Sequence, residues 1–315
     1  MRLFLLIFFA QIIVCSSCKE ERSYLKKVTF LSAYPSGSGL AYSDNKVYMM
    51  GDDASFMLVT DTAFKITDTI HFFPFKEKRI AKNVKKDPEA LAVLNKNDTA
   101  LILVVGSGSS DTLRNYCWLL NPLTKQKIEI RLDIFYQRLK AAGIKELNIE
   151  GATAIPSGIL LASRGNKAYP KNHLIFTSKN FWENQSLANI HIATIGVQKD
   201  TTQFQGVSGL DYSPRKDLLF LTVSTENTYN AYEDGIVGKS FLWVVKDLTL
   251  KQNYSAINPY KIIDLEEVDP LFKDQKIESV TIVSDKKNGD ELIFVADNDK
   301  GGSVLFKAEI IKEKD

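Results

Sequence analysis

Residues 150–154 read EGATA, and this five-residue pattern decides the fold because it recurs at four other places in the chain. Each copy has an acidic residue or a serine, a small residue, an apolar residue, then Ala, Thr or Asp, and finally an apolar or aromatic residue. The other copies are SGLAY at 38–42, EALAV at 89–93, SGLDY at 208–212 and ESVTI at 278–282. The first residues of successive copies, here called the anchors, lie 51 to 70 residues apart. A repeat of this period indicates a solenoid, a propeller or a similar array.

Apolar β-type runs bounded by turn residues follow every copy of the pattern. The runs that follow the copy at 89–93 are 100–105, 116–120 and 127–131. Four strands in a unit of about sixty residues are typical of a propeller blade. The last unit, 278–315, holds only three strands, but 18–37 contains the β-type run 27–31. We therefore expect an all-β protein. It should be a β-propeller of five four-stranded blades, or six if one long unit contains a further blade, with its last blade closed by the N-terminal strand.

The composition is that of an ordinary globular protein. The chain has 315 residues, of which 44% are hydrophobic and 25% charged, and its formal net charge is +2. This mixture excludes a disordered chain, and the balanced charge lacks the electrostatic footprint of a nucleic-acid-binding protein. Three cysteines, Cys15, Cys18 and Cys117, match neither a disulfide framework nor a zinc pattern. We expect a single, monomeric propeller domain over 27–312 that is stabilised by packing.

The N-terminus has the features of a processing signal. Arg2 is followed by an apolar stretch at 3–14, which is shorter than the ~20 residues of a membrane span. The segment 15–18 (CSSC) resembles a bacterial lipoprotein cleavage site, although Cys15 stands where leucine is usual. The resemblance implies that Cys18 becomes the lipidated first residue of the mature chain. Ordinary secretory cleavage is the alternative.

Lipidation would define both the ends and the location of the mature protein. It implies a signal peptide at 1–17 and a lipidated tether at 18–26. The residues at 19–21 (KEE) are similar to the export signal of surface lipoproteins of the Bacteroidota. We therefore expect a protein of the cell envelope that is attached to the outer membrane through its lipid alone, on the periplasmic or the outer side.

Two segments interrupt the strands just before an anchor. Residues 133–143 begin with Asp133, have apolar residues at helical spacing and end with a glycine, which predicts a short helix with Asp133 as its N-cap. Residues 269–272 predict a similar turn. The charged run 76–86 holds the same relative place before Glu89. Two interpretations of that run stay open: a solvated loop, or a rim that attracts an anionic substrate.

The anchor segments, together with apolar strands that end in Gly, Asp or Asn turns, resemble the phytase-like propeller family, also called "esterase-like activity of phytase". The resemblance covers nearly all of the mature chain. It implies a propeller fold, and related propellers carry lactonase, phosphoesterase or purely binding roles. The chain departs from the acidic anchor of that family at Ser38 and Ser208. An acid ring inferred from the family therefore has carboxylates at three of its five places.

The acidic anchors are the candidate metal ligands. The innermost strand of each blade lines the central channel, so Glu89, Glu150 and Glu278 are expected to converge there. Converging carboxylates raise one another's pKa values or hold a cation, and hard oxygen ligands favour Ca²⁺ or Mg²⁺ over Zn²⁺. We therefore predict a Ca²⁺ site at these residues. The structural alternative is that each carboxylate accepts hydrogen bonds from backbone N–H groups at the turn into its own strand.

The turns that leave the second strands supply further polar residues. In an antiparallel blade the end of the second strand lies beside the start of the first, so these turns share a rim with the anchors. The candidates from these turns are Asp52, Arg164, Asn166, Glu226, Asp297 and Asn298. The Arg164 guanidinium is suited to clamp a phosphate or carboxylate, and the others would bind the ligand. Asp and Asn are also what such turns need for their backbone alone, and this alternative stays open.

Two classes of function follow. In the first, a cation polarises a small phosphoester, ester or lactone and activates a bound water, with Glu150 and Arg164 as the catalytic residues. In the second, the protein is a non-catalytic scaffold that binds a ligand or partner at the mouth of its channel. The sequence has no Gly-x-Ser-x-Gly elbow, and its three histidines lack the spacing of a zinc helix motif. The family resemblance favours the first class.

Overall fold

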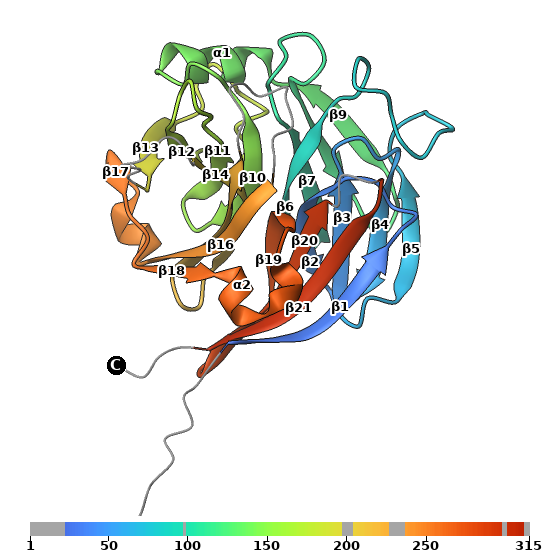
Figure 1. Cartoon of the computed structure of the whole chain (residues 1–315). Helices are drawn as coiled ribbons and strands as arrows, with labels where there is room; N and C mark the ends of the chain where they lie inside the picture. Colours follow the sequence, from blue (N-terminus) through green and yellow to red (C-terminus); the bar gives the residue numbers. More distant parts are fainter. Residues whose placement is uncertain (1–22, 97–98, 197–203, 227–236, 298–300, 312–315) are drawn as a thin grey trace, which may run out of the picture.

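The chain folds as a five-bladed β-propeller (Figure 1). The computed structural model describes residues 23–96, 99–196, 204–226, 237–297 and 301–311. Within these residues the strands form five sheets around a central axis, and no sixth sheet occurs. The predicted fold class and the prediction of five blades are both confirmed.

Each blade runs from an inner strand to an outer edge strand. The first blade consists of β2 (Gly37–Ser43), β3 (Lys46–Gly51), β4 (Phe56–Asp61) and β5 (Ile66–His71). The second consists of β6 (Pro88–Lys96), β7 (Thr99–Gly106), β8 (Tyr116–Leu120) and β9 (Lys127–Arg131). The third consists of β10 (Ile149–Ile155), β11 (Gly158–Ser163), β12 (Asn172–Thr177) and β13 (Ile190–Ile195), with β17 (Ala256–Ile257) added in parallel at its edge.

The fourth and fifth blades complete the ring. The fourth consists of β14 (Gln205–Ser213), β15 (Leu218–Glu226), β16 (Val237–Lys246) and β18 (Lys261–Asp264). The fifth consists of β19 (Lys276–Lys286), β20 (Gly289–Asp297), β21 (Ser303–Ile311) and β1 (Tyr24–Leu31). Consecutive inner strands, from β2 to β19 and back to β2, contact one another, which closes the ring.

The N-terminal strand closes the last blade, as predicted. β1 pairs antiparallel with β21, and Tyr24 lies opposite Glu309. Val28 packs against the apolar core of that blade, and the Lys26 ammonium is 2.7 Å from a carboxylate oxygen of Glu291 on β20. The pairing gives β21 a partner at an edge that would otherwise present unpaired backbone groups.

The register of the fifth blade places the two ends of the described chain together. Asp297 pairs with Lys276 on one side and with Ser303 on the other, which defines one end of the blade. Tyr24 and Ile311 lie at the opposite end. The starts of the inner strands are therefore far from both ends of the described chain.

Small residues in the repeated pattern let the inner strands touch. A Cβ atom on Gly39 would lie 2.9 Å from the carbonyl oxygen of Glu89, and one on Gly209 would lie 2.7 Å from that of Glu278. Carbon atoms are not found so close to a non-bonded oxygen, so the second position of the pattern must stay small where one inner strand packs on the next. The small residue in the repeat is therefore a packing requirement.

Short helices precede two of the inner strands. α1 (Asp133–Ala141) lies before β10 and η2 (Pro270–Phe272) lies before β19, both as the sequence predicted, and α2 (Leu265–Val268) precedes η2. A further turn of helix, η1 (Leu248–Lys251), follows β16. The predicted N-cap of α1 was wrong. The cap is Leu132, and the Asp133 carboxylate instead accepts hydrogen bonds from Arg131 and Asn115. Among the described residues, no helix has the length and apolar character needed to cross a membrane.

Candidate functional site

The five anchors occupy one structural position. In every inner strand the pairing with the second strand shifts by one residue, and the residue left out is the anchor. The anchors at these five shifts are Ser38, Glu89, Glu150, Ser208 and Glu278. A bulge of this kind re-aims a side chain and is common at barrel rims and beside active sites. The recurring acid or serine therefore marks the point where each inner strand begins to line the channel.

The turns after the second strands lie beside the anchors. Gly37 pairs with Gly51 in the first blade, and Lys276 pairs with Asp297 in the fifth. The end of each second strand is thus adjacent to the start of its inner strand. We call this end of the ring, which holds the anchors and the turns after β3, β7, β11, β15 and β20, the mouth.

Most of the polar residues predicted from these turns lie at the mouth. The predicted residues whose side chains are described there are Asp52, Arg164, Asn166 and Asp297. Glu226 ends β15, but its side chain lies outside the described residues, as does the whole of Asn298. Cys18 also lies outside them.

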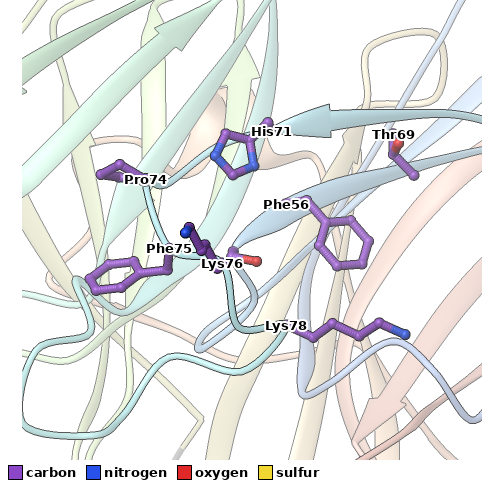
Figure 2. Close-up of a pocket in the computed structure, with 8 residues that line it drawn as sticks. Phe56, Thr69, His71, Pro74, Phe75, Lys76 and Lys78 are labelled. Atoms are coloured by element: carbon purple, nitrogen blue, oxygen red, sulfur yellow. The ribbon is translucent and has the colours of Figure 1, made fainter.

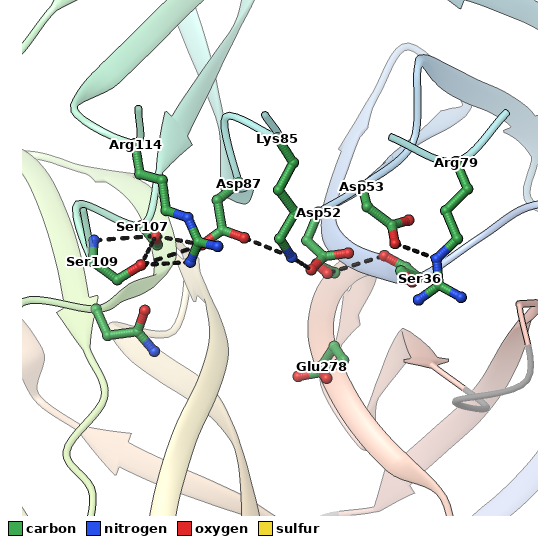
Figure 3. Close-up of polar contacts among 12 residues, drawn as sticks. Ser36, Asp52, Asp53, Arg79, Lys85, Asp87, Ser107, Ser109, Arg114 and Glu278 are labelled. Carbon is green, nitrogen blue, oxygen red and sulfur yellow. Dashed lines mark hydrogen bonds and ion pairs between the residues drawn. The ribbon is translucent and has the colours of Figure 1, made fainter. Parts of the chain in front are cut away.

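The tightest group of carboxylates at the mouth consists of Asp52, Asp87 and Glu89, here called the acidic triad. One oxygen from each lies within 4.8 Å of the others, and no other acidic group of this kind occurs in the described part of the chain. The Lys85 ammonium is 2.8 Å from Asp87 Oδ1 and forms a second ion pair with Asp52 (Figure 3). Arg114 donates a hydrogen bond of 2.7 Å to Asp87 Oδ2. Cations of the protein itself therefore neutralise part of the triad.

The environment of the acidic triad favours protons and cations. Burial raises the pKa of Glu89 well above its usual value, and the charges of Asp87 and Glu150 raise it further. Burial also raises the pKa of Asp52 to about 6, although the charge of Lys85 opposes this shift. Burial lowers the pKa of Lys85, but the charges of Asp52 and Asp87 outweigh burial and raise it overall. Glu89 is half-buried as a residue, and its carboxyl group holds its proton to a higher pH than an ordinary glutamate does.

The other two acidic anchors lie at the mouth but outside the acidic triad. Glu150 accepts a hydrogen bond of 2.5 Å from Asn148 Nδ2, and a carboxylate oxygen of Glu278 is 3.0 Å from Lys276 Nζ. Each of these partners stands two residues before its anchor. The charge of Glu150 acts on Glu89, but the three acidic anchors do not bring their oxygens within 4.8 Å of one another. The group that the geometry offers to a cation therefore shares only Glu89 with the predicted Ca²⁺ ligands.

Arg164 reaches across to the neighbouring blade. It is buried, its Nη2 is 3.5 Å from the hydroxyl of Ser224 on β15, and its backbone N–H donates to the carbonyl of Asn148. Gly206 on β14 leaves room for the guanidinium, because a Cβ atom there would lie 2.4 Å from Arg164 Nε. The side chain is thus fixed beside the inner strands, in a position from which it could orient an anion.

Several predicted or considered residues have positional roles. Ser208 donates a hydrogen bond of 2.6 Å to the carbonyl of Ile277 on the next inner strand, and Ser38 donates to a backbone carbonyl in its own turn. Asn166 Oδ1 accepts hydrogen bonds of 2.9 Å from the N–H groups two and three residues further on. Its Nδ2 donates to Glu146. These contacts are the turn chemistry that the sequence analysis left open.

Lys85, Asp87 and Arg114 were not predicted as site residues. Asp87 had a usable signal, because it stands two residues before an anchor, as Asn148 and Lys276 do. Lys85 belongs to the charged run 76–86, but it is buried and paired instead of solvated. Arg114 lies 27 residues after its partner Asp87, and nothing in the local sequence connects the two.

Residues 33–310 match the model of a family described as a family of unknown function, DUF6929. The chain belongs to the DUF6929 family. The match shows the DUF6929 family, and the resemblance of the anchor segments to the phytase-like family stays a prediction. No curated protein matches the DUF6929 chain.

Three solved structures are similar to this DUF6929 protein at low sequence identity, and one of them has a TM-score above 0.5. A glutaminyl cyclase from Myxococcus xanthus is similar with a TM-score of 0.51 and 7% identity, over 92% of this chain and 97% of that one. A DUF4221 family member from Bacteroides vulgatus has a TM-score of 0.38 and 10% identity, over 91% and 81% of the two chains. A DUF4623 family protein from Bacteroides eggerthii has a TM-score of 0.39 and 12% identity, over 92% and 76%.

Proposed function

We propose that this DUF6929 protein is an enzyme that works at the mouth of its channel, with Glu89 as the group that transfers a proton to or from a small polar substrate. The observation that carries the proposal is the position of Glu89, which is half-buried at the mouth and has a carboxylate oxygen within 4.8 Å of those of two other carboxylates. Buried like charges of this kind move a carboxyl pKa toward the range where general acid–base catalysis is efficient. Glu89 would accept or donate the proton, and Lys85 would stabilise negative charge that develops nearby.

The fold supports an enzyme only in general terms. The solved structure described as a glutaminyl cyclase, at 7% identity and a TM-score of 0.51, is an example of an enzyme with a similar fold. The substrate class therefore has to come from a screen. Esters, phosphoesters, lactones and peptides with N-terminal glutamine form a suitable first set.

Glu89→Gln tests the proposal, because the amide keeps the size of the side chain and removes its proton transfer. We expect a loss of about a hundredfold or more in turnover of any substrate found in the screen. Glu183→Gln, at an exposed acid away from the mouth, is the matched control and should keep full turnover. Equal activity of the Glu89 variant and the unchanged protein would contradict the proposal.

Metal-assisted hydrolysis is the second candidate, and the spacing of the acidic triad favours it. Three carboxylates with oxygens within 4.8 Å of one another, set against the Lys85 ammonium and the Arg114 guanidinium, leave one negative charge, which suits a cation. The oxygen donors fit Ca²⁺ or Mg²⁺. With the cation bound, polarisation of the substrate would be its contribution, Glu150 would add negative charge beside it, and Arg164 would orient the anion.

Lys85 makes the metal candidate testable. Its ammonium occupies the space between Asp52 and Asp87, so Lys85→Met should increase affinity for Ca²⁺ by removing a competing charge. Calorimetric titration of both proteins with Ca²⁺ and Mg²⁺ gives the comparison. Absence of binding at roughly millimolar metal in both proteins would remove this candidate and leave acid–base catalysis by the side chains. Absence of turnover across the substrate screen would instead favour the non-catalytic scaffold.

We also propose that the protein is held in the cell envelope by a lipid on Cys18. The support is the sequence at 15–18 and the apolar stretch before it. Labelled palmitate should be incorporated into the protein in cells and should be absent from Cys18→Ala, with Cys15→Ala as the matched control. Labelling that survives the Cys18 change would overturn this proposal.

A further inference from the structure

An open cavity on the outer part of the first blade has binding chemistry that differs from that of the mouth. Its volume is about 600 Å³. Its walls come from β4, β5 and the loop after β5 (Figure 2). The lining side chains used below are Phe56, Thr69, His71, Phe75, Lys76 and Lys78.

The cavity lies on the same side of the propeller as the mouth but away from its axis. Phe56 begins β4 and pairs with His71, which ends β5, and the turn before β4 carries the mouth residue Asp52. No residue of the acidic triad lines the cavity, and Arg79, next to the lining residue Lys78, bonds to Asp53 at 2.5 Å. The cavity is therefore separate from the acidic triad.

The cavity carries positive charge without a neutralising partner. Lys76, Lys78 and His71 are exposed, and within the described part of the chain none of their side chains forms a hydrogen bond or an ion pair. Glu77 stands between the two lysines in sequence but does not line the cavity. Other cations of the same loop, among them Arg79, Lys85 and Lys86, pair with carboxylates. Two ammonium groups without a carboxylate partner thus line the same cavity, and they attract an anion that carries more than one charge.

Aromatic surface completes the lining. The Phe56 ring is held by edge-on packing on Tyr34, with ring centroids 5.2 Å apart. Phe75 packs against the apolar core between the first two blades. The Thr69 hydroxyl adds a donor at the rim. The cavity therefore combines a rigid apolar wall with flexible cationic groups. In small-molecule sites apolar side chains commonly line the pocket, and a few polar or charged groups orient the ligand.

We propose that this cavity binds a small organic phosphate, with the phosphate at Lys76 and Lys78 and an aromatic or aliphatic body against Phe56. A phosphate monoester fits better than a carboxylate because its charge near neutrality approaches two, and lysine binds phosphate as a point charge. The site is distinct from the catalytic site proposed at the mouth and does not depend on it.

Phenyl phosphate is a suitable probe, and calorimetric titration of the protein is the measurement. We expect saturable 1:1 binding. Inorganic phosphate lacks the ring and phenol lacks the charge, so each should bind at least about tenfold more weakly. Lys76→Gln with Lys78→Gln should weaken phenyl phosphate binding about tenfold, because two exposed charge contacts are lost. Phe56→Ala should weaken phenyl phosphate but leave inorganic phosphate unchanged.

Two control variants keep the result specific. Lys46→Gln with Lys65→Gln removes the same charge at the opposite end of the same blade and should leave binding unchanged. Arg164→Gln tests whether the probe binds at the mouth instead. The proposal is overturned if phenyl phosphate does not saturate at roughly ten-millimolar concentration, or if the Lys76/Lys78 variant binds as the unchanged protein does. It is also overturned if binding is lost in Arg164→Gln alone.

Discussion

The Lys85 ammonium lies 2.8 Å from Asp87 Oδ1, and both side chains are buried at the mouth of the channel. Such a pair costs desolvation on both sides, and removing one partner leaves the other buried and uncompensated. Lys85→Met should therefore destabilise the fold by about 3 kcal/mol. Urea unfolding at neutral pH measures this difference.

The matched control for the buried pair is an exposed one. Lys125 is 2.7 Å from Asp68, and both side chains are more than a third exposed. Lys125→Met should change stability by less than about 0.5 kcal/mol, because solvent screens the pair. Similar losses in the two variants would mean that Lys85 contributes no more than a surface charge.

The raised pKa of Glu89 predicts a pH-dependent stability difference. The folded state holds the Glu89 proton at a pH where the unfolded chain has lost it, so this group makes stability fall as pH rises above about 4.5. Glu89→Gln lacks the effect. The variant should therefore gain stability relative to the unchanged protein as pH rises from about 4 to 7. Thermal melts across this range measure the trend.

Glu129 is a control, because its pKa is shifted in the direction opposite to that of Glu89. Burial raises its pKa, but hydrogen bonds from Lys86 and Trp118 outweigh burial and lower it overall. Glu129 therefore stabilises the fold at a pH above its pKa in the unfolded chain, and this stabilisation is lost as the pH falls. Glu129→Gln lacks it, so the variant should become less stable than the unchanged protein as the pH rises. Parallel trends in the two variants would contradict the assignment for Glu89.

The contact between inner strands predicts that Gly209 cannot be enlarged. Its Cβ atom would lie 2.7 Å from both the carbonyl oxygen of Glu278 and the Cα atom of Ser279. Gly209→Ala should cost about 2 kcal/mol through displacement of backbone. Gly289→Ala is the control, since its nearest neighbour at 3.2 Å is the end of the flexible Glu309 side chain. A chemical denaturation curve that places both variants at the same midpoint would contradict the packing argument.

The closure of the last blade predicts that β1 is needed for a stable ring. A chain that begins at residue 33 lacks β1, exposes the edge of β21 and loses the packing of Leu25 and Val28. We expect a lower melting temperature and a broader transition. A synthetic peptide of residues 23–32 should restore the transition, and a scrambled peptide should not. If the chain without β1 melts as the full chain does, β1 is not needed for the stability of the ring and the prediction is wrong.

The fold could be predicted from the sequence because three structural requirements are visible in one local pattern. The anchor occupies a bulge, the small residue after it allows the next inner strand to approach, and the apolar residue that follows packs between blades. Glu89 and Glu150 each begin a copy of the pattern, and they occupy equivalent positions in the second and third blades. Because every blade packs its inner strand in the same way, the same five-residue pattern recurs in the sequence.

The acidic triad could be predicted only in part from the sequence, because it depends on the path of one irregular loop. Ile80 donates its N–H to the carbonyl of Asp53, and Arg79 binds the Asp53 carboxylate, which holds the loop against the mouth and brings Lys85 inward. In the sequence, Lys85 looks like the solvated lysines around it. Its burial follows from tertiary contacts that no local spacing reports.

The pairing of β1 with β21 also determines at which end of the propeller a lipid on Cys18 would be attached. Tyr24 and Ile311 leave the propeller at the end opposite to the acidic triad. The stretch from Cys18 to Ser23 reaches at most about 18 Å when fully extended. If Cys18 carries the lipid that we propose, the membrane attachment lies at the end of the propeller opposite to Glu89, and the mouth would face away from the membrane.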